Sequence, residues 1–340
     1  MGFTYQFPAV KGKQAGREYY IAMVPLKLLT KLFPKEEDVV QPEFRAQRRI
    51  NETRIPEIKR YILNNRNNYV FSALSASIDG DFSFNPLGSN DLGILEIDMD
   101  SVFLINDGQH RKAAIEAALE EDDSLGDETI SIVLFKDDGL KRSQQMFTDL
   151  NKHAVKTSNS LSTLYDSRDE IAIATKEVID GNEFLKKYTD KERDILGKNS
   201  SKLFTLNTIY KSNSRILHKE TCNENDTAFL KQFWRELCAN IVEWNELVNK
   251  EITKKDLKEN YILTLAITIQ AFGKLGRLFY KDRKLDVKKE LTKLRAIDWE
   301  RSSQNWIGST IRDNGKVMNS EEAISLTYKK IIELMGLNEG

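Results

Sequence analysis

One stretch of the chain, residues 105–114, constrains the fold more than any other part of the sequence. The apolar run at 102–105 that leads into it is typical of a buried strand, and the alanine-rich run at 113–119 is typical of a helix. The sequence Asp107-Gly108-Gln109-His110-Arg111 therefore lies on a predicted strand-to-helix turn. Gly108 permits such a turn to be tight and lets the backbone approach a ligand closely.

This predicted turn has the chemistry of an anion site. A helix N-terminus presents unpaired N–H groups and a partial positive charge, both of which favour a phosphate. Cationic side chains beside it add charge-assisted donors. The sequence therefore predicts a site for a phosphate or nucleotide, or for DNA, built from Asp107, Gly108, Gln109, His110, Arg111 and Lys112. The simpler interpretation, in which Asp107 only caps the helix, remains open.

Residues 107–111 resemble the Asp-Gly-Gln-His-Arg signature of the DndB family, the regulatory component of bacterial DNA phosphorothioation gene clusters. Two further segments resemble the same family. One is Phe-x-Asp-Leu-Asn-Lys at 147–152 followed by Ser-Leu-x-x-Leu-Tyr-Asp at 160–166, and the other is the segment 298–306. The first of these makes Asn151 and Lys152 candidate members of the signature site, and capping of a helix end is their simpler interpretation.

More widely, the turn resembles that of the ParB/sulfiredoxin fold, in which a Gly-x-Arg-Arg or Gly-Cys-His-Arg turn holds nucleotide phosphates. The resemblance admits ATP or CTP with Mg²⁺ as a cofactor, although the residues themselves assign none. It also implies that an arginine-containing element before a helix contributes to the site. Arg54 is that candidate, and an exposed basic helix face is the alternative. Gln109 stands where sulfiredoxin has its reactive Cys, so thiol-based reductase chemistry is not expected.

The chain carries 51 basic and 52 acidic residues, so its net charge does not identify it as a nucleic-acid-binding protein. Basic residues instead cluster in the segments 45–66, 186–219 and 274–295, which are candidates for contacts with the phosphates of duplex DNA. Ordinary solvated faces are the alternative interpretation, and no helix-turn-helix signature is visible. The individual residues predicted to contact DNA are Arg45, Arg48, Arg49 and Arg215.

Cys222 and Cys238 are expected to be reduced thiols, since their spacing forms no CxxC or Cys/His metal motif. No metal site is predicted. The sequence contains no nucleophile elbow, Walker A, HExxH or Rossmann glycine motif, so no catalytic residue is assigned. Residues 1–9 do not form a signal peptide, and no apolar run approaches ~20 residues. We therefore expect a cytoplasmic protein without a membrane partner.

The alternation of strands and helices around the turn predicts an α+β (mixed α/β) fold. Beyond residue 145 the apolar periodicity is mostly helical. We therefore predict a ParB/sulfiredoxin-like domain at 1–145 and a mainly helical domain at 146–340. Besides 102–105, strands are expected at 17–25, 69–78, 93–97 and 130–135.

The family resemblance implies a DNA-binding regulator, of the transcriptional repressor type, for a bacterial DNA phosphorothioation gene cluster. Its expected partners are duplex DNA, other proteins of the phosphorothioation system and further copies of the same chain. Two alternatives remain open at this point. One is a ParB-like nucleotide hydrolase or nuclease that acts in DNA modification, and the other is a non-catalytic protein-interaction subunit.

Overall fold

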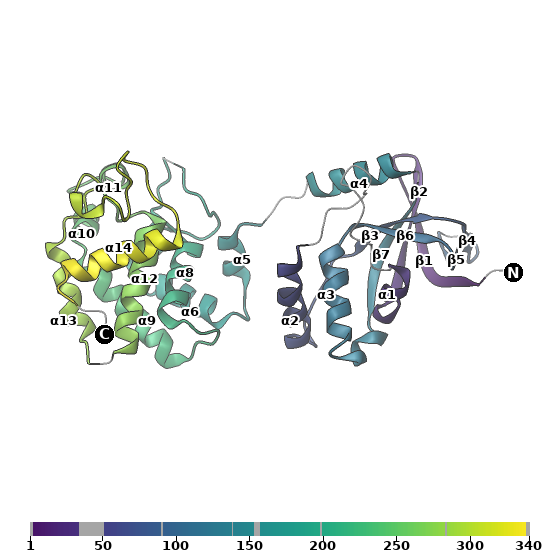
Figure 1. Ribbon diagram of the computed structural model, residues 1–340, viewed down its shortest axis with the longest axis horizontal. Coiled ribbons are helices and arrows are strands. Elements are labelled where there is room, and N and C mark those ends of the chain that lie inside the picture. Colours follow the sequence, from purple (N-terminus) through teal and green to yellow (C-terminus); the bar gives the residue numbers. More distant parts are fainter. Residues whose placement is uncertain are drawn as a thin grey trace. The chain divides into compact units, whose positions relative to one another are not determined.

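The computed structural model describes residues 3–33, 51–89, 91–137, 139–152, 157–197, 199–282 and 284–337. The chain divides into two compact units, Met1–Val155 and Lys156–Gly340 (Figure 1). The first mixes strands and helices and the second is mainly helical, so the predicted α+β class is confirmed. The division between the units follows helix α4 (Leu140–Lys152), within which the predicted boundary at residue 145 falls.

The first unit is built on a seven-stranded sheet with the strand order β4-β5-β1-β2-β7-β3-β6. Only the β3–β7 pair is parallel among the described pairs of this sheet. Most strands alternate buried and exposed residues, as a sheet with one covered face requires. The strands are β1 (Thr4–Gln14), β2 (Arg17–Pro25), β3 (Leu74–Asp79), β4 (Phe82–Pro86), β5 (Leu92–Asp98), β6 (Val102–Asp107) and β7 (Thr129–Lys136).

Helices cover one face of this sheet and bury the apolar residues of the strands. The core contains Ala22 and Ile105 from the sheet, Ile62 from α2 and Ile115 from α3. Helix α2 packs against α3, so the signature helix is held between the sheet and a second helix. The helical segments are η1 (Leu26–Leu28), α1 (Leu29–Leu32), η3 (Glu52–Arg54), α2 (Ile55–Asn64), α3 (Gln109–Leu119) and η4 (Asp123–Asp127).

Helix α4 lies on the opposite face of the sheet, next to β6. There the side-chain amide of Asn106 donates a hydrogen bond to the thioether sulfur, Sδ, of Met146 at 3.2 Å. Because residues alternate along β6, Asn106 faces away from the core that Ile105 enters. Farther along the same face Val10 and Met23 are half exposed, so α4 covers only part of it (Figure 1).

Two features of the sheet differ from the expectation. The strand predicted at 69–78 begins only at Leu74, because the carbonyl groups of Ser72 and Ala73 accept hydrogen bonds from Arg111 rather than from a neighbouring strand. The long strand β1 and the short strand β4 were not predicted from the sequence.

The second unit packs its helices around a core that contains all four tryptophans of the chain. Two of them, Trp299 and Trp306, stack with their ring centroids 5.2 Å apart. Helix α12 packs against both α8 and α14 (Figure 1). No described helix in either unit is both long enough and apolar enough to span a bilayer.

The helices of this unit are α5 (Asn159–Tyr165), α6 (Glu170–Asp180), α7 (Glu183–Tyr188), α8 (Leu206–Leu217), α9 (Glu224–Asn240), α10 (Val242–Asn249), α11 (Lys254–Asn260), α12 (Ala266–Lys281), α13 (Val287–Leu291) and α14 (Glu321–Leu334). Shorter elements are β8 (Thr189–Asp190), β9 (Phe204–Thr205), η5 (Thr292–Ala296) and η6 (Gln304–Trp306). Strands β8 and β9 pair in parallel.

Candidate functional site

The signature turn has the predicted strand-to-helix geometry. Strand β6 ends at Asp107, and Gly108 precedes α3 with a φ of 104°, in the left-handed region. A Cβ atom at Gly108 would lie only 2.4 Å from the Cδ2 atom of Leu74. Both the backbone conformation and the close approach of Leu74 therefore require glycine at this position.

Arg111 is fixed by several partners around the turn. Its Nη1 atom donates to the carbonyl oxygens of Ser72 at 2.7 Å and Ala73 at 3.0 Å and to the Ser72 hydroxyl. Its Nη2 atom lies 2.6 Å from the Oδ2 atom of Asp107. The guanidinium thereby joins the segment before β3 to the signature turn, which makes Arg111 a positioning residue for the turn.

The second cation of the signature is also paired inside the unit. The Nζ atom of Lys112 lies 2.8 Å from a carboxylate oxygen of Glu116, and both side chains are largely buried. Gln109 is buried as well. The structure therefore brings the predicted site residues together, but it uses the charges of Arg111 and Lys112 within the turn and its helix.

His110 connects the turn to the element that contains Arg54. The backbone N–H of Asn51 donates to the Nε2 atom of His110 at 3.0 Å, so Nε2 carries no proton in this arrangement. Asn51 also caps the short helix Glu52–Arg54 through its side chain. Arg54 is exposed and has no ion-pair partner among the described residues. The predicted proximity of this element to the signature is therefore present in the first unit.

Five predicted site residues have side chains outside the described part of the structure. Asn151 and Lys152 end α4, and their side chains lie outside the described part of the structure. Arg45, Arg48 and Arg49 lie outside the described residues altogether. Their roles remain predictions.

The second unit contains a cationic groove, which we define by its lining residues. It has a volume of about 420 Å³ and is lined by Arg215, His218, Lys274, Arg277, Leu278, Lys281 and Tyr328. Arg215 comes from the basic segment 186–219, and the other three lysines and arginines come from the segment 274–295. The packing of α8 against α12 brings the two segments together (Figure 1).

The cations of the groove differ in how far they are compensated. Arg215 binds Gln270 and the carboxylate of Glu321, and this contact lowers the pKa of Glu321. Lys274 donates to the hydroxyl of Ser325 at 2.8 Å. Arg277 and Lys281 have no hydrogen bond or ion pair within the part of the chain that the structure describes. No lining residue is acidic, so the groove has a net positive charge.

A comparison with known protein families identifies the chain. The sequence profile of DndB, described as DNA-sulfur modification-associated, matches residues 7–338. The chain belongs to the DndB family. Membership implies involvement in a DNA sulfur modification system. No curated protein and no solved structure matches the chain.

In this DndB family member, a sequence signal for the cationic groove is the spacing of its basic residues. Lys274, Arg277 and Lys281 stand at positions i, i+3 and i+7 of one helix and therefore share a face. A count of basic residues along the segment 274–295 does not reveal that face. Arg215 of α8 lies beside this face of α12 because of the way the helices pack, and no local sequence pattern predicts its position there.

Proposed function

We propose that this DndB family member is a DNA-binding regulator, of the repressor type, for its DNA phosphorothioation genes, and that the cationic groove binds DNA phosphates. The observation that carries the proposal is that Arg277 and Lys281 have no ion-pair partner among the described residues, in a groove that no described carboxylate lines. Family membership supplies the link to DNA sulfur modification.

The physical argument rests on counterion release. DNA phosphates condense cations, and each phosphate that a protein neutralises releases them, which makes binding depend steeply on salt. Lys274 and Lys281 are seven residues apart on α12 and thus span about 10 Å along its axis. Phosphates of one strand lie about 3.4 Å apart along the DNA axis, so this span is wide enough for a few of them.

Contacts of this kind position a protein on DNA without reading its sequence. Promoter preference requires further contacts, for which Arg45, Arg48 and Arg49 remain candidates in the first unit. We also retain the signature turn, residues 107–112 with Arg54, Asn151 and Lys152, as a proposed second phosphate or nucleotide site. The internal pairing of Arg111 and Lys112 means that backbone groups and His110 would have to contribute there.

The groove is tested with a charge-matched pair of double variants. Arg277→Gln with Lys281→Gln removes the two groove cations that have no partner among the described residues. Lys288→Gln with Lys289→Gln removes two exposed lysines of the same basic segment that do not line the groove. Binding of a promoter fragment and of random DNA is measured by fluorescence anisotropy over a range of salt concentrations.

The groove variant is expected to lose about 0.9 in log–log salt slope for each phosphate contact removed, and to weaken both DNAs alike. The control variant is expected to keep the slope of the unmodified chain. Equal slopes in the two variants would exclude the groove as the contact surface. Equal affinity of the unmodified protein for promoter and random DNA at physiological salt would contradict the regulator role itself.

A further inference from the structure

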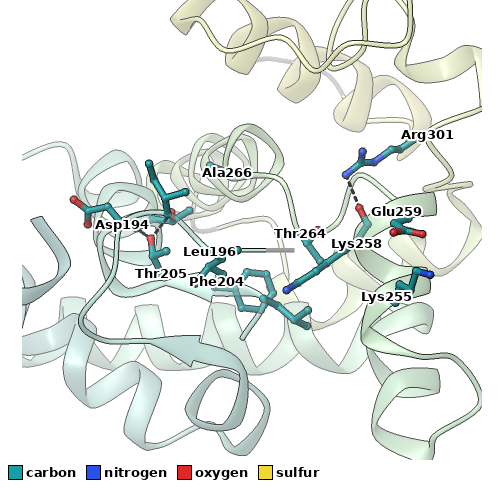
Figure 2. Close-up of a pocket in the computed structure, with 14 residues that line it drawn as sticks. Asp194, Leu196, Phe204, Thr205, Lys255, Lys258, Glu259, Thr264, Ala266 and Arg301 are labelled. Carbon is teal, nitrogen blue, oxygen red and sulfur yellow. Dashed lines mark hydrogen bonds between the residues drawn. The ribbon is translucent and has the colours of Figure 1, made fainter. Parts of the chain in front are cut away.

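A second cavity in the helical unit is separate from the groove in its lining residues. Its volume is about 540 Å³, within the range of pockets that hold small-molecule ligands. Figure 2 shows it between the loop that carries Asp194 and Leu196 and the side chains of Lys255, Lys258 and Arg301. Phe204, Thr205, Thr264 and Ala266 also line it.

Cations form one side of this cavity. Lys258 extends from α11 toward Leu196 and Phe204 (Figure 2) and donates to the carbonyl oxygen of Ser200 at 2.7 Å. The guanidinium of Arg301 donates to the carbonyl oxygen of Lys258 at 2.6 Å. Each of these acceptors is neutral. Lys255, one turn before Lys258, has no hydrogen bond among the described residues.

These positive charges are only partly balanced by the carboxylates of the cavity. None of the three cations lies within 4.0 Å of a carboxylate oxygen in the part of the chain that the structure describes. Burial lowers the pKa of Lys258, and burial also lowers the pKa of Arg301. Partly buried charges without a close ion-pair partner are unfavourable, so a bound anion would relieve this cost.

The two acidic residues of the lining supply little of that counter-charge. Both carboxylate oxygens of Asp194 accept hydrogen bonds at the start of α5, from the backbone N–H groups of Asn159 at 2.7 Å and Ser160 at 2.8 Å. Glu259 is exposed and makes no ion pair with a described residue, and its charge offsets only part of the effect of burial on the pKa of Arg301. The charge of Asp194 is thus directed to a helix start rather than to the cavity.

The start of α12 adds to the positive potential of the same cavity. Thr264 and Ala266 line the cavity, and Leu265 at the N-cap provides no side-chain hydrogen bond to the helix. The N-terminal dipole of this 16-residue helix therefore acts together with the side-chain cations.

Apolar side chains form much of the remaining wall. Leu196, Leu203 and Phe204 line it, and Ile195 is 85% exposed in the same loop. A cavity with cations on one side and apolar side chains on the other suits a ligand with an anionic head and a less polar body.

We propose that this cavity binds a small organic phosphate of about the size of a nucleoside monophosphate. Its phosphate group would lie against Lys255, Lys258 and Arg301, and its body against Leu196 and Phe204. This ligand site is distinct from the cationic groove, so its occupancy and DNA binding can be measured separately.

The test uses the full chain with AMP, adenosine and inorganic phosphate as probes in isothermal titration calorimetry. AMP is expected to bind more tightly than either of its parts. Lys255→Gln is expected to weaken AMP and phosphate about tenfold, as loss of a charge-assisted contact implies. Lys254→Gln is the matched control, because Lys254 precedes Lys255 on α11 and does not line the cavity.

Two further variants test the contribution of the apolar wall and the independence of this cavity from the cationic groove. Leu196→Ala is expected to weaken AMP while leaving inorganic phosphate unchanged. The groove variant Arg277→Gln with Lys281→Gln is expected to retain AMP binding, which distinguishes failure of this site from failure of the DNA groove. Equal effects of Lys254→Gln and Lys255→Gln, or no binding of AMP, CMP, GMP, UMP or inorganic phosphate at millimolar concentration, would overturn the proposal.

Discussion

The Nη2 atom of Arg111 lies 2.6 Å from the Oδ2 atom of Asp107, so the first and last residues of the signature bind each other across Gly108. The same guanidinium holds the carbonyl groups of Ser72 and Ala73. One side chain therefore connects β6, α3 and the segment that leads into β3. In this chain the signature therefore holds elements of the first unit together, and it is also a candidate ligand site.

Arg111→Lys is expected to lower the free energy of unfolding of the first unit by about 1–3 kcal/mol, because an ammonium group cannot reproduce the fork of hydrogen bonds. Hydrogen–deuterium exchange measures the change, with faster exchange expected in α3 and β3. Arg54→Lys is the control, since Arg54 is exposed and unpaired among the described residues. Unchanged exchange in Arg111→Lys would contradict a positioning role.

Gly108→Ala is expected to destabilise the first unit more than Gly88→Ala does. Both glycines have positive φ angles, 104° and 80°, so both substitutions carry a backbone cost of about 1 kcal/mol. Only at Gly108 does the new Cβ atom also meet Leu74, whereas nothing lies within 4 Å of it at Gly88. Urea unfolding followed by circular dichroism compares the two variants, and equal midpoints would show that the contact with Leu74 is unimportant.

Local pattern was sufficient to predict the turn and most strands, because alternation and helix periodicity are set by neighbouring residues. It failed at β1, where Pro8 argues against a strand. In the structure the N–H of Lys11 points to the β5 side, where it donates to the carbonyl oxygen of Asp91. Because N–H directions alternate along a strand, an N–H at Pro8 would point toward β2, whose pairing with β1 begins only at Ala9, so its loss is tolerated. Such tolerance depends on the neighbouring strand and is not visible in the segment itself.

The basic segments were evident from composition, but their meeting in one groove was not. It depends on how closely α8 approaches α12. A Cβ atom at Gly273 would lie 2.7 Å from the carbonyl oxygen of Ser212, and one at Gly276 would lie 2.8 Å from Ile216. These two glycines permit the close packing, and only the three-dimensional fold shows which helix they accommodate.

Both thiols of the chain are expected to react slowly with iodoacetamide in the native state. Burial raises the pKa of the Cys238 thiol to about 12 and also raises the pKa of Cys222. At pH 7.5 the thiolate fraction of Cys238 is then on the order of 10⁻⁴ or less. Mass spectrometry after timed labelling checks this, with the urea-unfolded chain as the fast-reacting control. Rapid native labelling of either thiol would contradict this expectation and would make thiol-based chemistry plausible again.

Glu243 is expected to make the second unit less stable as pH rises through the weakly acidic range. Its Oε2 atom is buried without a hydrogen-bond partner among the described residues. Burial, with the nearby carboxylates of Glu246, Asp298 and Glu300, raises the pKa of Glu243 to about 7. Below about pH 4.5 the folded and unfolded states are both protonated, and the group has no effect on stability. Between about pH 4.5 and 7 only the unfolded state releases its proton, so stability falls, and above pH 7 the loss is constant.

Glu243→Gln should therefore stabilise the second unit at pH 8 by about 1–2 kcal/mol, a value reduced from the full shift because the side chain is partly exposed. The gain should disappear below about pH 4.5. Urea unfolding followed by tryptophan fluorescence measures it, since all four tryptophans lie in this unit. Glu192→Gln, which removes an exposed carboxylate in the same unit, should show no such pH-dependent gain. A gain for Glu243→Gln that is equal at pH 4 and pH 8 would mean that packing of the amide, rather than relief of a buried charge, stabilises the variant.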